Sequence, residues 1–273
     1  MHTRAFRRLV PAIAGLALAL SACSSDGSTT TAVGTTSTTA APTSAASPIT
    51  GSLHVLAAAS LTGAFEAAKA TLTAANSGLD LTYSFAGSNA LVTQITQGAP
   101  ADVFASADIK NMQKLVDAGL VDPPVTFARN KLQIAVAAGN PKNVTGLADL
   151  ARPDLSVVLA AEGVPAGDYA RQVLAAENVT VTPKSLELDV KSALAKVTSG
   201  EADATVVYVT DVSAGGPKVA GVAVPDAEQP VITYPIAVVK TTKNRAAAQA
   251  FVESAVSGDV QQALEAAGFL APQ

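Results

Sequence analysis

Short strand-like segments alternate with helix-like segments from residue 53 to residue 267, and no other feature constrains the fold as much. Each strand-like segment is rich in Val, Leu, Ala or Tyr, and each helix-like segment has apolar residues three and four positions apart. Alternation of this kind implies parallel strands that are joined by crossover helices. The predicted fold class is therefore α/β.

The pattern also predicts the position of each element. The predicted strands span residues 53–58, 79–85, 102–105, 132–137, 156–160, 185–188, 204–208, 219–224 and 234–239. The predicted helices span residues 62–74, 89–97, 109–118, 147–150, 165–177, 190–199, 244–257 and 260–267. Residues 51–273 are long enough for close to two domains of ordinary size.

Residues 1–22 are predicted to be a signal peptide. Arg4, Arg7 and Arg8 precede an apolar run over residues 9–20, and acidic residues are absent from this region. The run is shorter than the about 20 apolar residues that a membrane-spanning helix needs. We therefore expect the segment to direct export and then to be removed.

Residues 20–23 (Leu-Ser-Ala-Cys) resemble the bacterial lipobox, which implies that Cys23 becomes the N-terminus and receives acyl chains such as palmitate. Cys23 is the only cysteine, so lipidation accounts for an otherwise unpaired thiol. The alternative is a secreted protein with a chance cysteine near its cleavage site. Residues 23–50 would form a disordered tether, because Ser and Thr make up 15 of the 27 residues in 24–50. We expect a lipid anchor on the outer face of the cell membrane.

Composition excludes several classes of function for the exported chain. Without the signal peptide, 15 Lys plus Arg stand against 22 Asp plus Glu, and a net charge of −7 disfavours nucleic acid as a partner. Once His2 is removed, His54 is the sole histidine, so a zinc cluster cannot be assembled and a Ser-His-Asp triad would have to use His54. His54 lies in a predicted strand and is interpreted as a half-exposed strand residue. We expect a binding protein and not an enzyme, with no cofactor and no free metal ion.

Four strand-to-helix junctions place small or hydroxyl residues where a helix is predicted to begin. They span residues 59–62, 87–90, 164–167 and 189–192. A helix N-terminus has amide groups without internal partners and a partial positive charge, which favours an anion. Ser60 and Ser88 fit the N-cap position, where a hydroxyl either caps its own helix or donates to a ligand. Ligands of doubly wound sheets bind at the carboxyl ends of the strands, where all four junctions would lie.

Several segments together resemble the molybdate-binding proteins of bacterial ABC importers. The segments are 57–62 (AAASLT), 85–88 (FAGS), 98–108 (GAPADVFASAD), 164–167 (VPAG), 206–208 (VVY) with Asp211 just beyond, and 234–239 (YPIAVV). The resemblance runs in order from about Leu53 to Phe269. Agreement of several short motifs makes it specific.

The resemblance implies a two-lobed type II binding protein, a clamshell in which each lobe is a mostly parallel sheet flanked by helices. One lobe would hold residues 51–130 and 229–273, and the other residues 131–228, with two strand-like crossings between them. Such a protein would be a monomer. It would capture molybdate, and also tungstate, in the cleft between its lobes and deliver the anion to the membrane permease of an ABC importer.

Matched motif by motif, the resemblance also implies which groups hold the oxyanion. Ser60, Ser88 and Tyr208 would donate through their hydroxyls. Ala166 and Val190 would donate through their backbone N–H groups. Molybdenum would be bound only as its oxyanion, through these five residues. The alternative for Tyr208 is a core tyrosine at the end of a strand.

Four further residues bear on the expected site. Gly87 stands where many relatives have a second Ser, so this chain has one hydroxyl fewer and a closer backbone approach. Asp189 is adjacent to Val190 and would bring a carboxylate near an anion. Asp102 and Asp108 are interpreted as structural, and Asp108 is predicted to cap the helix that begins at residue 109.

The chemistry of the expected donors favours a fully deprotonated anion. Molybdate carries no proton at neutral pH, whereas phosphate often keeps one and would need an acceptor. A receptor for sulfate, thiosulfate or phosphate is the alternative within this class. A hydrolase that uses Ser60 or Ser88 as its nucleophile lacks a base, since His54 is the only histidine and Lys69 would have to be deprotonated and nearby. A cell-envelope interaction protein without a small ligand is the third alternative.

Overall fold

The computed structural model describes residues 49–272. The predicted signal peptide, the lipidation residue Cys23 and the tether as far as residue 48 lie outside the described residues. Within 49–272, no helix is both long enough and apolar enough to cross a membrane.

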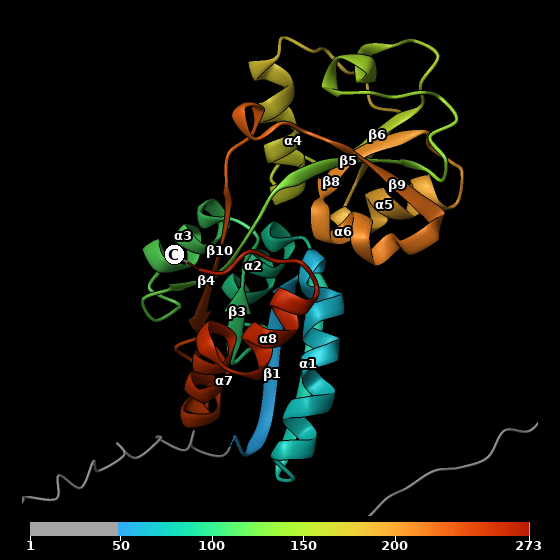
Figure 1. Cartoon of the computed structure of the whole chain (residues 1–273). Helices are drawn as coiled ribbons and strands as arrows, with labels where there is room; N and C mark the ends of the chain where they lie inside the picture. Colours follow the sequence, from blue (N-terminus) through green and yellow to red (C-terminus); the bar gives the residue numbers. More distant parts are fainter. Residues whose placement is uncertain (1–48, 273) are drawn as a thin grey trace, which may run out of the picture. The chain divides into compact units, whose positions relative to one another are not determined.

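The first sheet has the strand order β2-β1-β3-β10-β4 (Figure 1). Its strands are β1 (Gly51–Ala58), β2 (Leu79–Ala86), β3 (Val103–Ala105), β4 (Val125–Asn130) and β10 (Ile232–Val238). Strand β1 pairs in parallel with β2 and β3, while β10 runs antiparallel to β3 and β4. One strand out of five is thus reversed, and the sheet is mostly parallel as predicted.

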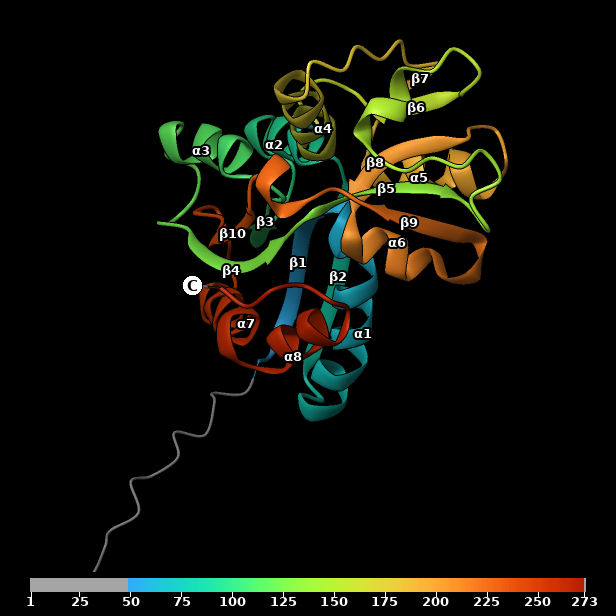
Figure 2. The same cartoon turned by 45° about the horizontal axis from the view of Figure 1, so that its top comes forward.

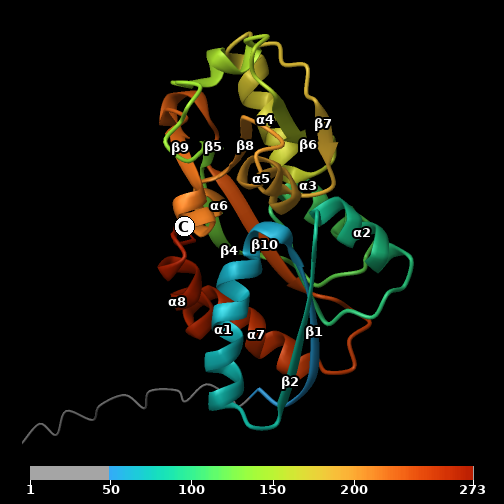
Figure 3. The same cartoon turned by 90° about the vertical axis from the view of Figure 1, so that its right-hand side faces the viewer.

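Helices cover both faces of this first sheet. The helices are α1 (Thr62–Ala75), α2 (Ser88–Thr96), α3 (Ile109–Asp117), α7 (Arg245–Ser257) and α8 (Asp259–Ala266). Helices α1, α7 and α8 cover one face and α2 and α3 the other (Figure 3). Alternate residues of β1 serve the two faces, because Leu53 and Val55 pack with the first group and Leu56 with the second. We call this sheet and these helices the first lobe.

The second sheet repeats the arrangement in the order β7-β6-β8-β5-β9. Its strands are β5 (Leu132–Ala137), β6 (Val157–Ala160), β7 (Ser185–Glu187), β8 (Ala204–Tyr208) and β9 (Val219–Ala223), and its helices are α4 (Pro165–Ala176), α5 (Val190–Thr198) and α6 (Val209–Gly215). Strand β6 is parallel to β7 and β8, and β5 is antiparallel to β8 and β9. We call this sheet and these helices the second lobe.

The chain passes between the lobes twice, from β4 to β5 and from β9 to β10 (Figure 2). A buried hydrogen bond lies near the first crossing, where Asn130 Nδ2 donates to Thr210 Oγ1 at 2.9 Å. Four short 3-10 helices complete the described elements: η1 (Ala59–Leu61), η2 (Leu147–Ala151), η3 (Gly216–Lys218) and η4 (Asp226–Glu228). The predicted α/β fold with two sheets in two lobes is confirmed.

Besides short 3-10 helices, one strand and one α-helix of the structure were not predicted. Strand β4 follows Pro123 and Pro124, which favour a loop. The six residues of the strand are too few to show a clear alternation of apolar and polar residues. Helix α6 contains β-branched Val209 and Thr210, which favour a strand. The helix nevertheless begins at residue 209, because the Asp211 carboxylate accepts a hydrogen bond from the Tyr208 N–H at 3.2 Å.

Candidate anion-binding site

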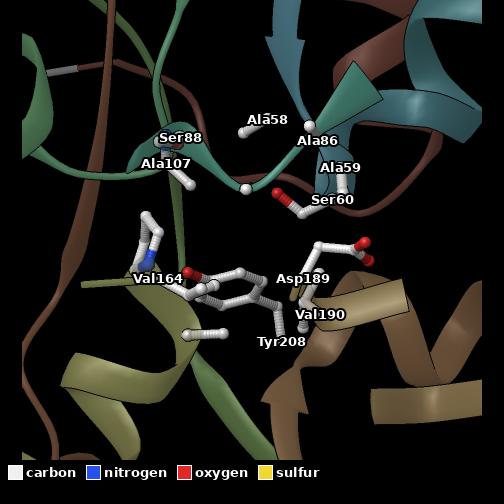
Figure 4. Close-up of a pocket in the computed structure, with 13 residues that line it drawn as sticks. Ala58, Ala59, Ser60, Ala86, Ser88, Ala107, Val164, Asp189, Val190 and Tyr208 are labelled. Atoms are coloured by element: carbon white, nitrogen blue, oxygen red, sulfur yellow. The ribbon is translucent and has the colours of Figure 1, made fainter. Parts of the chain in front are cut away.

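A small cavity lies between the lobes, and all five residues predicted to hold an anion line it. Figure 4 shows Ser60 and Ser88 on one side of the cavity and Val164, Val190 and Tyr208 on the other. The space among the lining atoms is about 200 Å³, a figure that includes space open to solvent. Each of the five predicted residues is at most 6% exposed. The cavity therefore suits a ligand of a few atoms.

The fold brings these residues together because each follows the carboxyl end of a strand. Ser60 lies in η1 after β1, and Ser88 begins α2 after β2. Ala166 is in the first turn of α4 after β6, Val190 begins α5 after β7, and Tyr208 ends β8. Carboxyl ends of parallel strands meet at one edge of a sheet, and the two edges face each other across the cavity.

The prediction that Ser60 and Ser88 are N-cap residues is wrong. Leu61 is the N-cap of α1 and Gly87 that of α2, and neither helix has a side-chain cap. The physical reason is that each hydroxyl is held by a partner outside its own helix. Ser60 Oγ is 3.1 Å from Tyr234 Oη, and Ser88 Oγ accepts from the Ala107 N–H at 3.1 Å.

The second lobe presents two helix starts to the cavity. Ala166 and Val190 lie in the first turns of α4 and α5, where backbone N–H groups have no carbonyl partner within the helix. The dipoles of these helices place partial positive charge at the same points. Two backbone donors are thus available beside the serine hydroxyls.

Tyr208 faces the cavity with an unsatisfied hydroxyl. The residue is 1% exposed, and within residues 49–272 its Oη has no hydrogen-bond partner. Burial raises the pKa of Tyr208 well above its ordinary value, so the hydroxyl stays protonated and remains a donor. A buried hydroxyl without a partner costs free energy, which a ligand that accepts its proton would recover.

Asp211 fixes the backbone of Tyr208 from behind the cavity. It is 1% exposed, and besides the Tyr208 N–H its second oxygen has no partner in the described part of the chain. Burial raises the pKa of Asp211 to about 7, against the opposing effect of the Lys191 charge. The carboxyl is therefore partly neutral near neutral pH, which reduces its repulsion of an anion.

Asp189 lines the cavity but its carboxylate is engaged elsewhere. It caps α5, where Oδ1 accepts from the Ser192 N–H at 2.9 Å and Oδ2 from the Ser192 hydroxyl at 3.0 Å. The lining residues include no Lys, Arg or His. The donors that face the cavity are therefore neutral hydroxyl and amide groups.

The lobes also touch at the rim of the cavity. Lys110 Nζ of α3 lies 2.9 Å from Asp168 Oδ2 of α4, and Asn111 Nδ2 donates to the Gly163 carbonyl at 3.2 Å. The Lys110 side chain is 66% exposed, so this ion pair adds little stability by itself. Gly87 makes a closer approach, because a Cβ atom there would lie 2.7 Å from the Leu188 carbonyl oxygen of the second lobe.

The remaining predicted roles can be placed in the structure. Asp108 caps α3 as predicted, since its Oδ1 accepts from the Asn111 N–H at 2.9 Å. Asp102 is structural, with Oδ2 accepting from the His54 N–H at 2.8 Å. His54 is a partly buried strand residue as predicted, and its ring nitrogens lie 3.0 Å from the Pro100 carbonyl and 2.9 Å from Ser84 Oγ. None of the three faces the cavity.

Sequence reasoning missed two residues that act on the serines. Tyr234 and Ala107 both lie in segments that carry the family resemblance, but no role was predicted for either. Tyr234 is 174 positions from Ser60, a separation that no local pattern reveals. Ala107 contributes only its backbone N–H, so the identity of its side chain gives no indication of this role.

Comparisons with known proteins show the family to which the chain belongs. The sequence model of the family described as "Bacterial extracellular solute-binding protein" matches residues 53–270. "Molybdate-binding protein ModA" of Mycobacterium tuberculosis is 43% identical over 222 residues, which cover 81% of this chain and 85% of the relative.

Two solved structures share the fold at equal TM-scores. The periplasmic molybdate-binding protein of Azotobacter vinelandii is 24% identical with a TM-score of 0.67, covering 81% of this chain and 100% of that one. The sulfate-binding protein SubI of Mycobacterium tuberculosis is 22% identical with a TM-score of 0.67, covering 80% and 86%. The fold alone therefore does not distinguish between these two anions.

Proposed function

We propose that this chain, which belongs to the family of bacterial extracellular solute-binding proteins, captures molybdate in the cavity between its lobes. It would then deliver the anion to the membrane permease of an ABC importer. The observation that supports this most directly is the convergence of neutral donors on one small cavity, with the unpartnered Tyr208 hydroxyl among them. The family is one of binding proteins, in agreement with the expectation that the chain is not an enzyme.

The proposed ligand set consists of five donors and no acceptor. Ser60, Ser88 and Tyr208 would donate through hydroxyls, and Ala166 and Val190 through N–H groups. A fully deprotonated oxyanion has only acceptors, so its oxygens match such a set. Neutral donors also avoid an uncompensated charge in the empty cavity, which would be costly to bury.

Two observations support molybdate as the anion: the name of a 43% identical relative, and the absence of a proton on molybdate. The 43% identical relative is named for molybdate, whereas the sulfate-binding structure is only 22% identical. Tungstate has nearly the same size and charge as molybdate, so we propose it as a second ligand. Sulfate and phosphate receptors remain the alternative. Phosphate is disfavoured because its proton would meet donors alone.

Export and anchoring form a second part of the proposal. Residues 1–22 would be removed as a signal peptide, Cys23 would carry the acyl chains, and residues 23–50 would tether the lobes to the outer face of the cell membrane. The tether would keep a monomeric receptor within reach of its permease. Mass spectrometry of the membrane-extracted protein tests this, because an acylated N-terminal peptide that begins at Cys23 is expected.

We also propose which residues belong to each of the two lobes that would move relative to each other. Residues 51–130 with 229–273 would form one rigid lobe, and residues 131–228 the other. The two strand-to-strand crossings support these limits, since β4 and β5 belong to different sheets, as do β9 and β10. Closure about the crossings would bury the anion, and opening would release it.

Thermal unfolding of the full-length chain with different anions tests the proposed ligand. We expect molybdate and tungstate to stabilise the protein, by about 4 kcal/mol at a thousandfold excess over the dissociation constant. Sulfate and phosphate should have much smaller effects at equal concentration. Stabilisation by sulfate alone would overturn the assignment, and no shift with any anion would favour an interaction protein without a small ligand.

Tyr208→Phe separates a ligand contact from a core role. The hydroxyl has no partner to lose in the unliganded protein, so the melting temperature without anion should stay near that of the wild type. Molybdate affinity should fall about 10- to 100-fold, because a hydrogen bond to a charged group is lost. Titration calorimetry measures the affinity. A large drop in the unliganded melting temperature with unchanged affinity would show that Tyr208 is a core residue.

A further inference from the structure

We infer that Tyr234 is a positioning residue, whose hydroxyl holds Ser60 as a donor to the bound anion and thereby makes the site select oxyanions that carry no proton. The inference rests on the proposed function, because it concerns the same cavity. Tyr234 itself does not line the cavity and is not among the five proposed ligand residues.

The contact is buried and specific. Tyr234 is 0% exposed and Ser60 6%, and their oxygens are 3.1 Å apart. Among residues 49–272, Ser60 Oγ is the atom at hydrogen-bond distance from the Tyr234 hydroxyl, and the Asn130 and Tyr208 side chains also act on its pKa. Tyr234 lies in β10, the strand that receives the second crossing, and the pairing of β10 with β4 is irregular between Tyr234 and Pro235. The contact thus joins a crossing strand to the cavity.

The direction of this hydrogen bond follows from a count of protons. Either oxygen could donate to the other in the empty protein. A deprotonated oxyanion can only accept, so Ser60 must give its single proton to the ligand. The Tyr234 hydroxyl must then donate to Ser60 Oγ. In the liganded protein Tyr234 therefore occupies one of the two acceptor lone pairs of Ser60.

Ser88 has the same arrangement with a different partner. Its oxygen accepts from the Ala107 N–H at 3.1 Å, and a backbone N–H can never accept. Each serine thus accepts one hydrogen bond from a protein donor, which directs its proton toward the cavity. The partner of Ser88 is main chain and cannot be removed by substitution. Tyr234 is the partner that mutagenesis can remove.

Two features keep the Tyr234 hydroxyl protonated and fixed in position: its burial and the packing of its ring. Burial raises its pKa well above the ordinary value, although the hydrogen bond with Ser60 opposes the shift. The ring packs edge-on against Tyr208, Phe127 and Phe269, with centroid distances of 5.8, 6.3 and 5.5 Å. A phenylalanine at this position keeps those contacts, so Tyr234→Phe removes the hydroxyl alone.

Selectivity follows from the occupied acceptor. Hydrogen phosphate carries the same charge as molybdate but has one proton to donate, and a site of donors leaves that proton unpaired at a cost. In Tyr234→Phe both lone pairs of the Ser60 oxygen are free, and the Ser60 hydroxyl can turn so that it accepts from the ligand. The variant should therefore lose affinity for molybdate while hydrogen phosphate loses none or gains.

Calorimetric titration of the full-length chain with molybdate, sulfate and hydrogen phosphate, in alkaline buffer, tests this. We expect Tyr234→Phe to weaken molybdate binding about tenfold. The ratio of the molybdate affinity to the hydrogen phosphate affinity should fall by about tenfold or more. Tyr83→Phe is the matched control, since it also removes a buried tyrosine hydroxyl, but one that has no hydrogen-bond partner in the described residues and lies outside the cavity. It should change neither affinity nor preference.

A double-mutant cycle with Ser60→Ala guards against a general packing effect. Tyr234→Phe should have no further effect on molybdate affinity once Ser60 is alanine. An equal loss in both backgrounds, or an unchanged preference between the two anions, would overturn the inference. If the wild type binds sulfate and not molybdate, the proposed ligand fails. The role of Tyr234 is then decided by the same cycle, with sulfate as the unprotonated anion.

Discussion

Gly87→Ala will weaken oxyanion binding by about 5- to 100-fold and leave the unliganded protein as stable as the wild type. A Cβ atom at Gly87 would lie 2.7 Å from the carbonyl oxygen of Leu188, which belongs to the opposite lobe and cannot rotate away. Overpacking of this kind costs about 1–3 kcal/mol, and each 1.4 kcal/mol is a factor of ten in affinity. Opening of the cleft relieves the Leu188 contact, and Asn89 Oδ1, also 2.7 Å away, is the end of a side chain that can rotate. The cost therefore falls mainly on the closed, liganded form.

Calorimetric titration and unliganded melting curves check this result, with Gly63→Ala as the control. Gly63 lies in α1 of the same lobe, and a Cβ atom there would meet nothing within 4 Å. The control should bind as the wild type does. Wild-type affinity in Gly87→Ala would mean that the lobes do not approach as closely in the liganded protein.

The same distance explains why a serine is absent at this position. A hydroxyl at Gly87 would add a donor, but the side chain would have to displace the Leu188 carbonyl or the Asn89 amide, also 2.7 Å away. The proposed site has two serine hydroxyls and one tyrosine hydroxyl for this reason. We therefore expect Gly87→Ser to lose more through the contact than it gains through the new donor.

Gly167→Ala should lower the free energy of unfolding by about 3 kcal/mol, at the upper end of the cost of overpacking. A Cβ atom at Gly167 would lie 2.3 Å from the carbonyl oxygens of both Ala160 and Ala161. These are main-chain atoms at the end of β6, so α4 must move away as a whole. The shift would also displace the Ala166 N–H, and molybdate binding should fall with stability.

Urea unfolding of the full-length chain measures this effect, and Gly146→Ala is the control in the second lobe. Gly146 has an extended backbone and open space at its Cβ position, so its substitution should be nearly neutral. If Gly167→Ala unfolds like the control, α4 packs less closely on β6 than the structure has it.

The sequence predicted the framework because the framework follows from local pattern. Most strands and helices were predicted close to their observed positions, since burial of one face repeats with a period that the spacing of apolar residues shows. The five candidate ligand residues converge on one cavity because each follows a strand end, and strand ends meet. Their roles as ligands stay a prediction, as does the acylation of Cys23.

What the sequence could not predict depends on partners far along the chain. Serine favours the N-cap position in general, yet Ser60 is held by Tyr234 and Ser88 by Ala107, so tertiary hydrogen bonds override the local preference. Helix α6 is a similar case, because the Asp211 carboxylate starts a helix in a segment of β-branched residues. The sequence shows that residue 87 is a glycine, but it does not show that the Leu188 carbonyl oxygen leaves no room for a side chain there.

The absence of Lys, Arg and His from the cavity lining has a consequence for the surroundings in which the protein works. A receptor outside the cell meets changing ionic strength, and dissolved salt weakens attraction between exposed charges more than contacts that are buried. Hydroxyl and amide donors that hold an anion in a closed cavity belong to the buried kind. Retention of the anion would thus be nearly independent of the salinity around the cell, whereas its first encounter with a chain of net negative charge would be helped by salt.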